Sequence, residues 1–180
     1  TEVRHTLPAP AYYLPETYAR EQEQLWYRQW VYAGRAELVA SPGDFLTVDI
    51  AGQSILVTRN DEGGLKAFYN VCSHRGAQLC DDTRGTTKAV FQCPYHAWCY
   101  DLNGALVATP RVGEDEVDRP TLGLKPVHID TWQGFMFLNL DRGAVTPLRE
   151  ALDGHYDSPL RFEKHEMDQL VTVHRTESVV

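Results

Sequence analysis

The chain has 180 residues, of which 43% are hydrophobic and 23% are charged, and this composition predicts one folded domain with a real core rather than a disordered segment. The net charge of −8 argues against nucleic acid and anionic membrane as partners. No apolar stretch approaches the roughly 20 residues that a membrane span needs, and no leader is visible, so we expect a soluble, cytoplasmic protein.

A helix is predicted first, from Pro15 to Trp30. Proline suits the first turn of a helix, where its missing N–H leaves no hydrogen bond unmade. Tyr18, Leu25 and Trp26 fall near one face of this helix, together with Trp30. The pattern therefore indicates an amphipathic N-terminal helix.

Short strands separated by turn residues follow the helix. The predicted strands cover residues 45–50, 55–58, 65–69, 88–92, 105–108, 127–130 and 135–140. A short helix is expected at 147–156. A last strand at 170–180 stops without a turn or a polar tail, so we expect the sequence to continue in a longer polypeptide. The class is mainly antiparallel β with a few helices, or α+β.

Two loops, at 70–84 and 93–98, carry the chemistry. Cys72 and His74 lie in the first, and Cys93 and His96 lie in the second, in the pattern Cys-x-His, 18 residues, Cys-x-x-His. Two such loops can clamp a [2Fe–2S] core, with the thiolates on one iron and the imidazoles on the other. The pattern therefore indicates a Rieske-type cluster that carries single electrons.

Other interpretations of these four residues stay open. Two cysteines and two histidines also suit tetrahedral zinc, although zinc motifs usually pair cysteine with cysteine. A disulfide between Cys72 and Cys93 would leave both histidines unexplained, and simple core packing would not produce the paired spacing. Cys80 and Cys99 are expected to be buried thiols and not ligands.

Five neighbours are expected around the cluster. Pro94 stiffens the second loop, and Gly76 permits a backbone shape that lets amides approach the sulfurs. Trp98 and Tyr95 can shield the cluster from water and so tune its potential. Arg75 completes this group.

The two loops resemble those of a known family. The matching stretches are 70–80 and 91–104, with further similarity at 30–35, 42–45 and 132–140. The chain resembles the N-terminal Rieske domain of the α subunit of Rieske non-heme iron oxygenases, the ring-hydroxylating oxygenases. The resemblance implies a Rieske iron–sulfur-protein-like antiparallel β-sandwich with a cluster-binding subdomain. It divides the chain into an N-terminal helix and lead-in (1–40), the Rieske domain (41–142), and a helix and strand (143–180) that lead to a catalytic domain.

The same resemblance implies an oxidoreductase, a mono- or dioxygenase component. Electrons from a reductase or ferredoxin would pass through this domain to a mononuclear Fe(II) in the catalytic domain, so no catalytic residue is expected in this chain. A trimeric homo-oligomer is implied, as is a substrate from aromatic hydrocarbon catabolism or a quaternary amine. The alternative is a free-standing Rieske-type ferredoxin.

The redox potential can also be anticipated. The related proteins of the bc complexes carry an extra disulfide between the two loops, and the corresponding positions here are Ala77 and Tyr95. Because that disulfide is absent and Ala97 offers no hydroxyl, we expect a potential toward the low end of the Rieske range of roughly −150 to +300 mV.

Overall fold

The computed structural model describes residues 6–110, 112 and 117–152, and antiparallel strands dominate this part of the chain. The strands are β1 (Val31–Arg35), β2 (Asp44–Ile50), β3 (Gln53–Arg59), β4 (Leu65–Tyr69), β5 (Arg84–Thr86), β6 (Val90–Gln92), β7 (Cys99–Asp101), β8 (Leu106–Ala108), β9 (His128–Trp132) and β10 (Phe135–Asn139). The helices are α1 (Pro15–Glu21) and α2 (Leu148–Ala151), with a π-helical turn at Gln22–Trp26 and 3₁₀ turns at Ala9–Tyr12, Ala36–Val39 and Arg119–Thr121. The mainly β class is confirmed.

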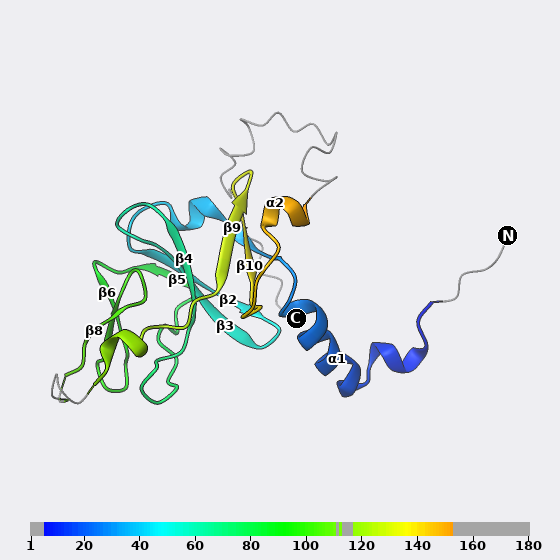
Figure 1. Cartoon of the computed structure of the whole chain (residues 1–180), viewed down its shortest axis with the longest axis horizontal. Coiled ribbons are helices and arrows are strands. Elements are labelled where there is room, and N and C mark those ends of the chain that lie inside the picture. The colour runs from blue at the N-terminus through cyan, green and yellow to red at the C-terminus, as the bar shows by residue number, and fades with distance from the viewer. Residues whose placement is uncertain (1–5, 111, 113–116, 153–180) are drawn as a thin grey trace.

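Three sheets are built from these strands. A four-stranded sheet has the order β4-β3-β2-β5, and three-stranded sheets have the orders β1-β10-β9 and β6-β7-β8. All the pairs are antiparallel. Figure 1 shows the β6-β7-β8 sheet at the end of the molecule opposite to α1.

The four-stranded sheet is the middle layer because its side chains alternate between two cores. Phe45, Leu56 and Phe68 face the loop-side core, which packs against β6, β7 and β8. Leu46 and Val57 face the base core, which packs against β1 and β10. The loop-side core also contains Cys72, Leu79, Phe91, Cys93, Trp98, Tyr100, Leu102, Leu106 and Leu124. The candidate loops are therefore anchored in a core of their own.

The N-terminal helix is shorter than predicted. It ends as a π-helical turn at Trp26, and the chain is extended again from Val31. The side-chain amide of Asn139 donates to the backbone carbonyl of Arg28 at 3.1 Å. From Val31 onward the chain pairs with β10 and so joins a sheet. Neither α1 nor the π-helical turn buries a side chain, so the predicted apolar face is exposed. No described helix is long and apolar enough to cross a membrane.

The strand predictions differ from the structure mainly in three short elements. The strands β1, β5 and β7 were not predicted, and the expected strand at 88–92 is limited to β6. The helix predicted at 147–156 is observed as α2, and residues 153–156 lie outside the described part. The strand predicted at 170–180 also lies outside it.

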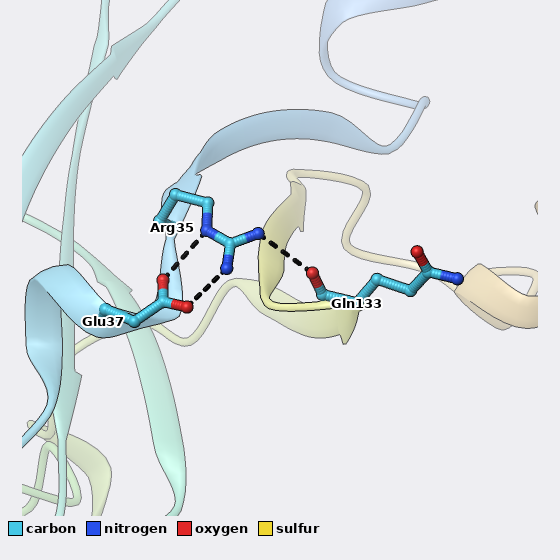
Figure 2. A network of polar contacts seen from close by, with 3 residues as sticks. All are labelled: Arg35, Glu37 and Gln133. Atoms are coloured by element: carbon cyan, nitrogen blue, oxygen red, sulfur yellow. Dashed lines mark hydrogen bonds and ion pairs between the residues drawn. The ribbon is translucent and has the colours of Figure 1, made fainter. Parts of the chain in front are cut away.

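A buried arginine joins β1 to the hairpin of β9 and β10. The Arg35 guanidinium binds both carboxylate oxygens of Glu37 and donates to the carbonyl of Gln133 at 3.0 Å (Figure 2). It also lies over the ring of Phe135, 4.6 Å from the centroid. Because Arg35 is only 8% exposed, its charge is stabilised by these contacts rather than by water. The network therefore ties β1 to the turn between β9 and β10 within the β1-β10-β9 sheet.

Candidate functional site

The two candidate loops are closed by the same pair of backbone hydrogen bonds. In the first loop the backbone amide of Cys72 donates to the carbonyl of Ala77 at 2.8 Å, and the amide of Gly76 donates to the carbonyl of Cys72 at 3.0 Å. In the second loop the amide of Cys93 donates to the carbonyl of Trp98 at 2.8 Å, and the amide of Ala97 donates to the carbonyl of Cys93 at 3.0 Å. Each loop therefore turns tightly around its cysteine.

Each turn needs a left-handed residue four positions after its cysteine. Gly76 fills this position in the first loop with φ +71°, as expected for a glycine. Ala97 fills it in the second with φ +58°, where a Cβ is unfavourable by about 1–2 kcal/mol. The second loop therefore carries conformational strain that the first does not.

Replacing Ala97 with glycine is expected to stabilise the protein by about 0.5–1 kcal/mol, because it removes the left-handed strain at some cost in chain entropy. For a chain of this size the thermal midpoint should rise by about 1–4 °C. The matched control is Gly76→Ala, which adds a Cβ with nothing within 4 Å and should lower the midpoint by conformation alone. An A97G midpoint at or below that of the parent would contradict the strain.

The structure brings the two predicted ligand histidines together and the two predicted ligand cysteines together. The imidazole rings of His74 and His96 lie 4.6 Å apart between centroids, at 72° to one another. Cys72 and Cys93 are buried free thiols, 1% and 2% exposed, and Cys93 is close enough to raise the pKa of Cys72. The disulfide between them, which was left open as an alternative, is not formed. Among the described residues, no three His, Cys, Asp or Glu side chains gather around a single point. The donors are therefore arranged as a sulfur pair and a nitrogen pair.

The aromatic neighbours divide between the two histidines. Trp98 is 4% exposed and stacks on His74, with ring centroids 4.5 Å apart and an angle of 11°. Tyr95 lies against His96 at 3.8 Å and 37°, but it is 61% exposed. Of the two residues expected to shield the site, Trp98 excludes water and Tyr95 lies on the surface.

Tyr100 is a site residue that the sequence pattern did not reveal. Its hydroxyl lies 3.2 Å from the sulfur of Cys72 and accepts the amide of Ser73 at 3.1 Å. Burial, together with the hydrogen bond to Cys72, raises the pKa of this phenol, so it remains protonated. Either atom of this pair can donate when the thiol is neutral, but a metal-bound thiolate can only accept, so the phenol proton would then be directed to the sulfur. The site therefore holds a hydroxyl group that can donate to the sulfur, from β7 and not from the loop, which weakens the argument for a potential at the low end of the range.

The electrostatics of Cys72 are balanced between burial and hydrogen bonding. Burial raises the pKa of the Cys72 thiol, and the hydrogen bonds from Tyr100 and from the His74 amide act in the opposite direction. A buried thiolate needs such donors or a bound cation. The pocket is therefore suited to a sulfur that is ionised only when a metal is attached.

The site passes a test of whether its residues fit a metal group. The Nδ1 atom of His74 is buried and has no hydrogen-bond partner. Because nearly all buried polar atoms are partnered, this nitrogen is left available to a ligand. The two buried thiols supply the soft donors that iron–sulfur chemistry uses. Two sulfurs and two imidazole nitrogens therefore fit a [2Fe–2S] cluster.

The other residues that were expected around the cluster lie on the two loops, as predicted, but at the surface of the protein. Arg75 and Pro94 are exposed, as is Gly76. Cys80 and Cys99 are half-buried free thiols. Burial and the nearby Asp82 and Asp81 raise the pKa of Cys80 to about 11, and the thiol of Cys99 donates to the carbonyl of Ala97 at 3.3 Å.

Asn70 is a second residue that the sequence pattern did not reveal. Its side chain accepts the amide of Cys80 at 2.9 Å and donates to the carbonyl of Cys80 at 2.7 Å. It also donates to the hydroxyl of Ser54 at 3.1 Å on β3. The first loop is therefore closed at its base by one fully buried amide.

Comparison with known proteins gives a consistent result. Residues 29–129, more than half of the chain, match the family described as the Rieske [2Fe-2S] domain. The glycine betaine monooxygenase oxygenase subunit of Chromohalobacter salexigens is 40% identical over 137 residues, which cover 76% of this chain and 30% of that protein. The anthranilate 1,2-dioxygenase large subunit of Acinetobacter baylyi is 38% identical over 140 residues, with 77% and 30% covered.

Solved structures agree with these relatives. The quaternary ammonium Rieske monooxygenase CntA in complex with L-carnitine superposes with a TM-score of 0.78 at 31% identity, covering 84% of this chain and 43% of that one. Naphthalene 1,2-dioxygenase from Rhodococcus sp. bound to indole gives a TM-score of 0.78 at 27% identity, covering 83% and 34%. The chain spans about a third of the length of the curated relatives it matches.

Proposed function

Because the chain belongs to the Rieske [2Fe-2S] domain family, we propose that Cys72, His74, Cys93 and His96 hold its cluster and that the domain transfers electrons within an oxygenase. The observation that carries the proposal is the meeting of the two loops, with their thiols paired and their imidazole rings 4.6 Å apart. Bound there, the cluster accepts and donates one electron at a time.

The chain's own residues set the conditions for that transfer. Tyr100 directs its proton to the sulfur of Cys72, which favours the more negative, reduced state. Trp98 keeps water from the inner side of His74. On the outer side, His96 lies beneath the exposed ring of Tyr95, so the histidine edge is the place where an electron enters or leaves. Arg75 lies exposed beside it, in a chain of net charge −8.

The proposal places the domain in the oxygenase component of a longer enzyme. Its relatives are named as oxygenase subunits and match it over up to 93% of its length, which favours an oxygenase over a free-standing ferredoxin. In that enzyme, electrons from a reductase or ferredoxin would pass through this domain to a mononuclear iron. One related structure is described with inter-subunit electron transfer, which supports a homo-oligomer.

Two classes of substrate follow from the relatives. Several are named for quaternary ammonium compounds, among them glycine betaine, carnitine and choline. Others are named for anthranilate and naphthalene, which belong to the aromatic class that the family resemblance implied. Product formation by the whole enzyme from glycine betaine, carnitine and anthranilate distinguishes the two classes.

The cluster itself is tested on this chain. Iron and acid-labile sulfide should be present in equal amounts, and the dithionite-reduced protein should show the rhombic electron paramagnetic resonance (EPR) signal of a histidine-ligated [2Fe–2S] cluster. A colourless protein that contains zinc and gives no such signal would contradict the electron-transfer role and make the site structural.

Replacing Tyr100 with phenylalanine is expected to lower the midpoint potential by tens of millivolts. A hydrogen bond that favours the reduced state tenfold corresponds to about 59 mV for one electron. The potential is measured by redox titration followed by EPR. Tyr95→Phe is the matched control, because Tyr95 contacts His96 through its ring, and it should leave the potential unchanged. An unchanged potential in Y100F would show that the hydroxyl does not act on the cluster.

A further inference from the structure

We propose that Trp98 is a positioning residue, which holds the imidazole of His74 in the plane that ligation requires by stacking on it from the opposite loop. The inference rests on the proposed cluster and adds a role for a side chain outside its ligand set. The two rings are nearly parallel, at 11°, with centroids 4.5 Å apart. One loop therefore determines how a ligand of the other loop is oriented.

Trp98 itself is held in place more firmly than the ring it orients. It is 4% exposed and packs in the loop-side core with Tyr100 and both ligand cysteines. Its carbonyl accepts the amide of Cys93 at 2.8 Å, so its backbone is part of the turn that carries the second loop. Any rotation of the indole would require this core to repack.

The Nδ1 atom of His74 is buried, has no hydrogen-bond partner and is the nitrogen available for ligation, so an orienting contact has to come from elsewhere on the ring. The ring meets His96 edge to face and Trp98 face to face, and the nearly parallel stack is the contact that resists a tilt of the imidazole out of its plane. Ligand histidines are usually oriented by a partner outside the metal shell. Here the buried indole face of Trp98 is the partner that orients His74.

The two histidines differ in this respect. The neighbour of His96 is Tyr95 of the same loop, tilted by 37° and 61% exposed. A largely exposed side chain can move without disturbing a core, so it restrains its histidine less. The orienting effect is therefore expected at Trp98 and not at Tyr95, which makes Tyr95 the matched control.

The test compares the reduced holo-protein of the parent, W98F, W98L and Y95L by EPR, whose g-values depend on the geometry of the ligands. W98L, which has no ring, should shift the g-values and broaden the signal. W98F, which keeps a ring, and Y95L should match the parent within the line width. Parent-like g-values in W98L, a shift in W98F equal to that in W98L, or an equal shift in Y95L would each overturn the proposal.

A second non-ring variant, W98M, covers the case in which W98L binds no cluster. If both lack the cluster but keep the far-ultraviolet circular dichroism of the parent apo-protein, while W98F holds it, the proposal is supported. If both lose that spectrum, Trp98 is a residue of the fold only, and the proposal is overturned. A parent protein without the rhombic signal would instead refute the proposed cluster, so the two failures are distinct.

Discussion

Alanine in place of Cys72 or Cys93 is expected to abolish the cluster, with loss of iron, sulfide, visible absorption and the EPR signal. Each thiol is buried in the loop-side core. Cluster assembly needs all four donors, and metal binding of this kind is coupled to folding. The variants should therefore also unfold at a lower temperature than the parent holo-protein.

Cys80 and Cys99 are the matched controls for this experiment. Both are free, half-buried thiols on the same two segments, and Cys80→Ala and Cys99→Ala should keep iron and sulfide at the parent level. Iron retained in C72A, or lost equally from C80A, would show that the donor set is assigned wrongly. His74→Ala and His96→Ala are expected to behave as C72A does.

The strands that were predicted most completely are those long enough to show an alternating pattern. The pairs β2 with β3 and β3 with β4 come from alternating segments of five to seven residues. Length does not decide every case, because β6 and β8 have three residues each and fall in predicted strands, whereas β1 has five and was missed together with β5 and β7. The missed strands are defined by their pairing with β10, with β2, and with β6 and β8 respectively, which is tertiary information.

The end of the N-terminal helix illustrates the same limit. The apolar spacing of the sequence continues to Trp30. In the structure, however, Val31 pairs with β10, and the indole of Trp30 donates to the carbonyl of Thr146. Both partners lie more than a hundred residues away along the chain. Local periodicity therefore marks the start of this helix better than its end.

At the site, local spacing was enough for the ligands but not for the residues that support them. The two Cys and His motifs are visible because each lies within four residues. The hydroxyl of Tyr100 reaches Cys72 across 28 positions, and only the folding of β7 beneath the first loop brings it there. A tyrosine at the inward position of the strand after the second loop is the signal that could have indicated it.

Replacing Asn70 with alanine is expected to destabilise the fold by about 1–3 kcal/mol and to speed the loss of the cluster. Asn70 is fully buried, and its side chain satisfies both the amide and the carbonyl of Cys80. Alanine would leave the amide of Cys80 unpaired, at about 1–3 kcal/mol for a buried group, while the carbonyl of Cys80 would keep the hydrogen bond from the side chain of Gln78 at 3.0 Å. Because Asn70 and Cys80 bracket Cys72 and His74, the loss opens the loop that carries half of the ligands.

The control is Asn60→Ala, the same change at a site with similar burial and a similar set of bonds. Asn60 is 1% exposed, accepts the amide of Gly64 at 2.7 Å and donates to Asn103 at 2.8 Å, on a turn outside both loops. Urea unfolding gives the stability of each variant, and decay of the visible absorption in the presence of a chelator gives the rate of cluster loss. N60A should lose stability while its cluster decays near the parent rate under native conditions, whereas N70A should lose both. Equal decay in the two variants would mean that Asn70 supports the fold in general and not the base of the ligand loop.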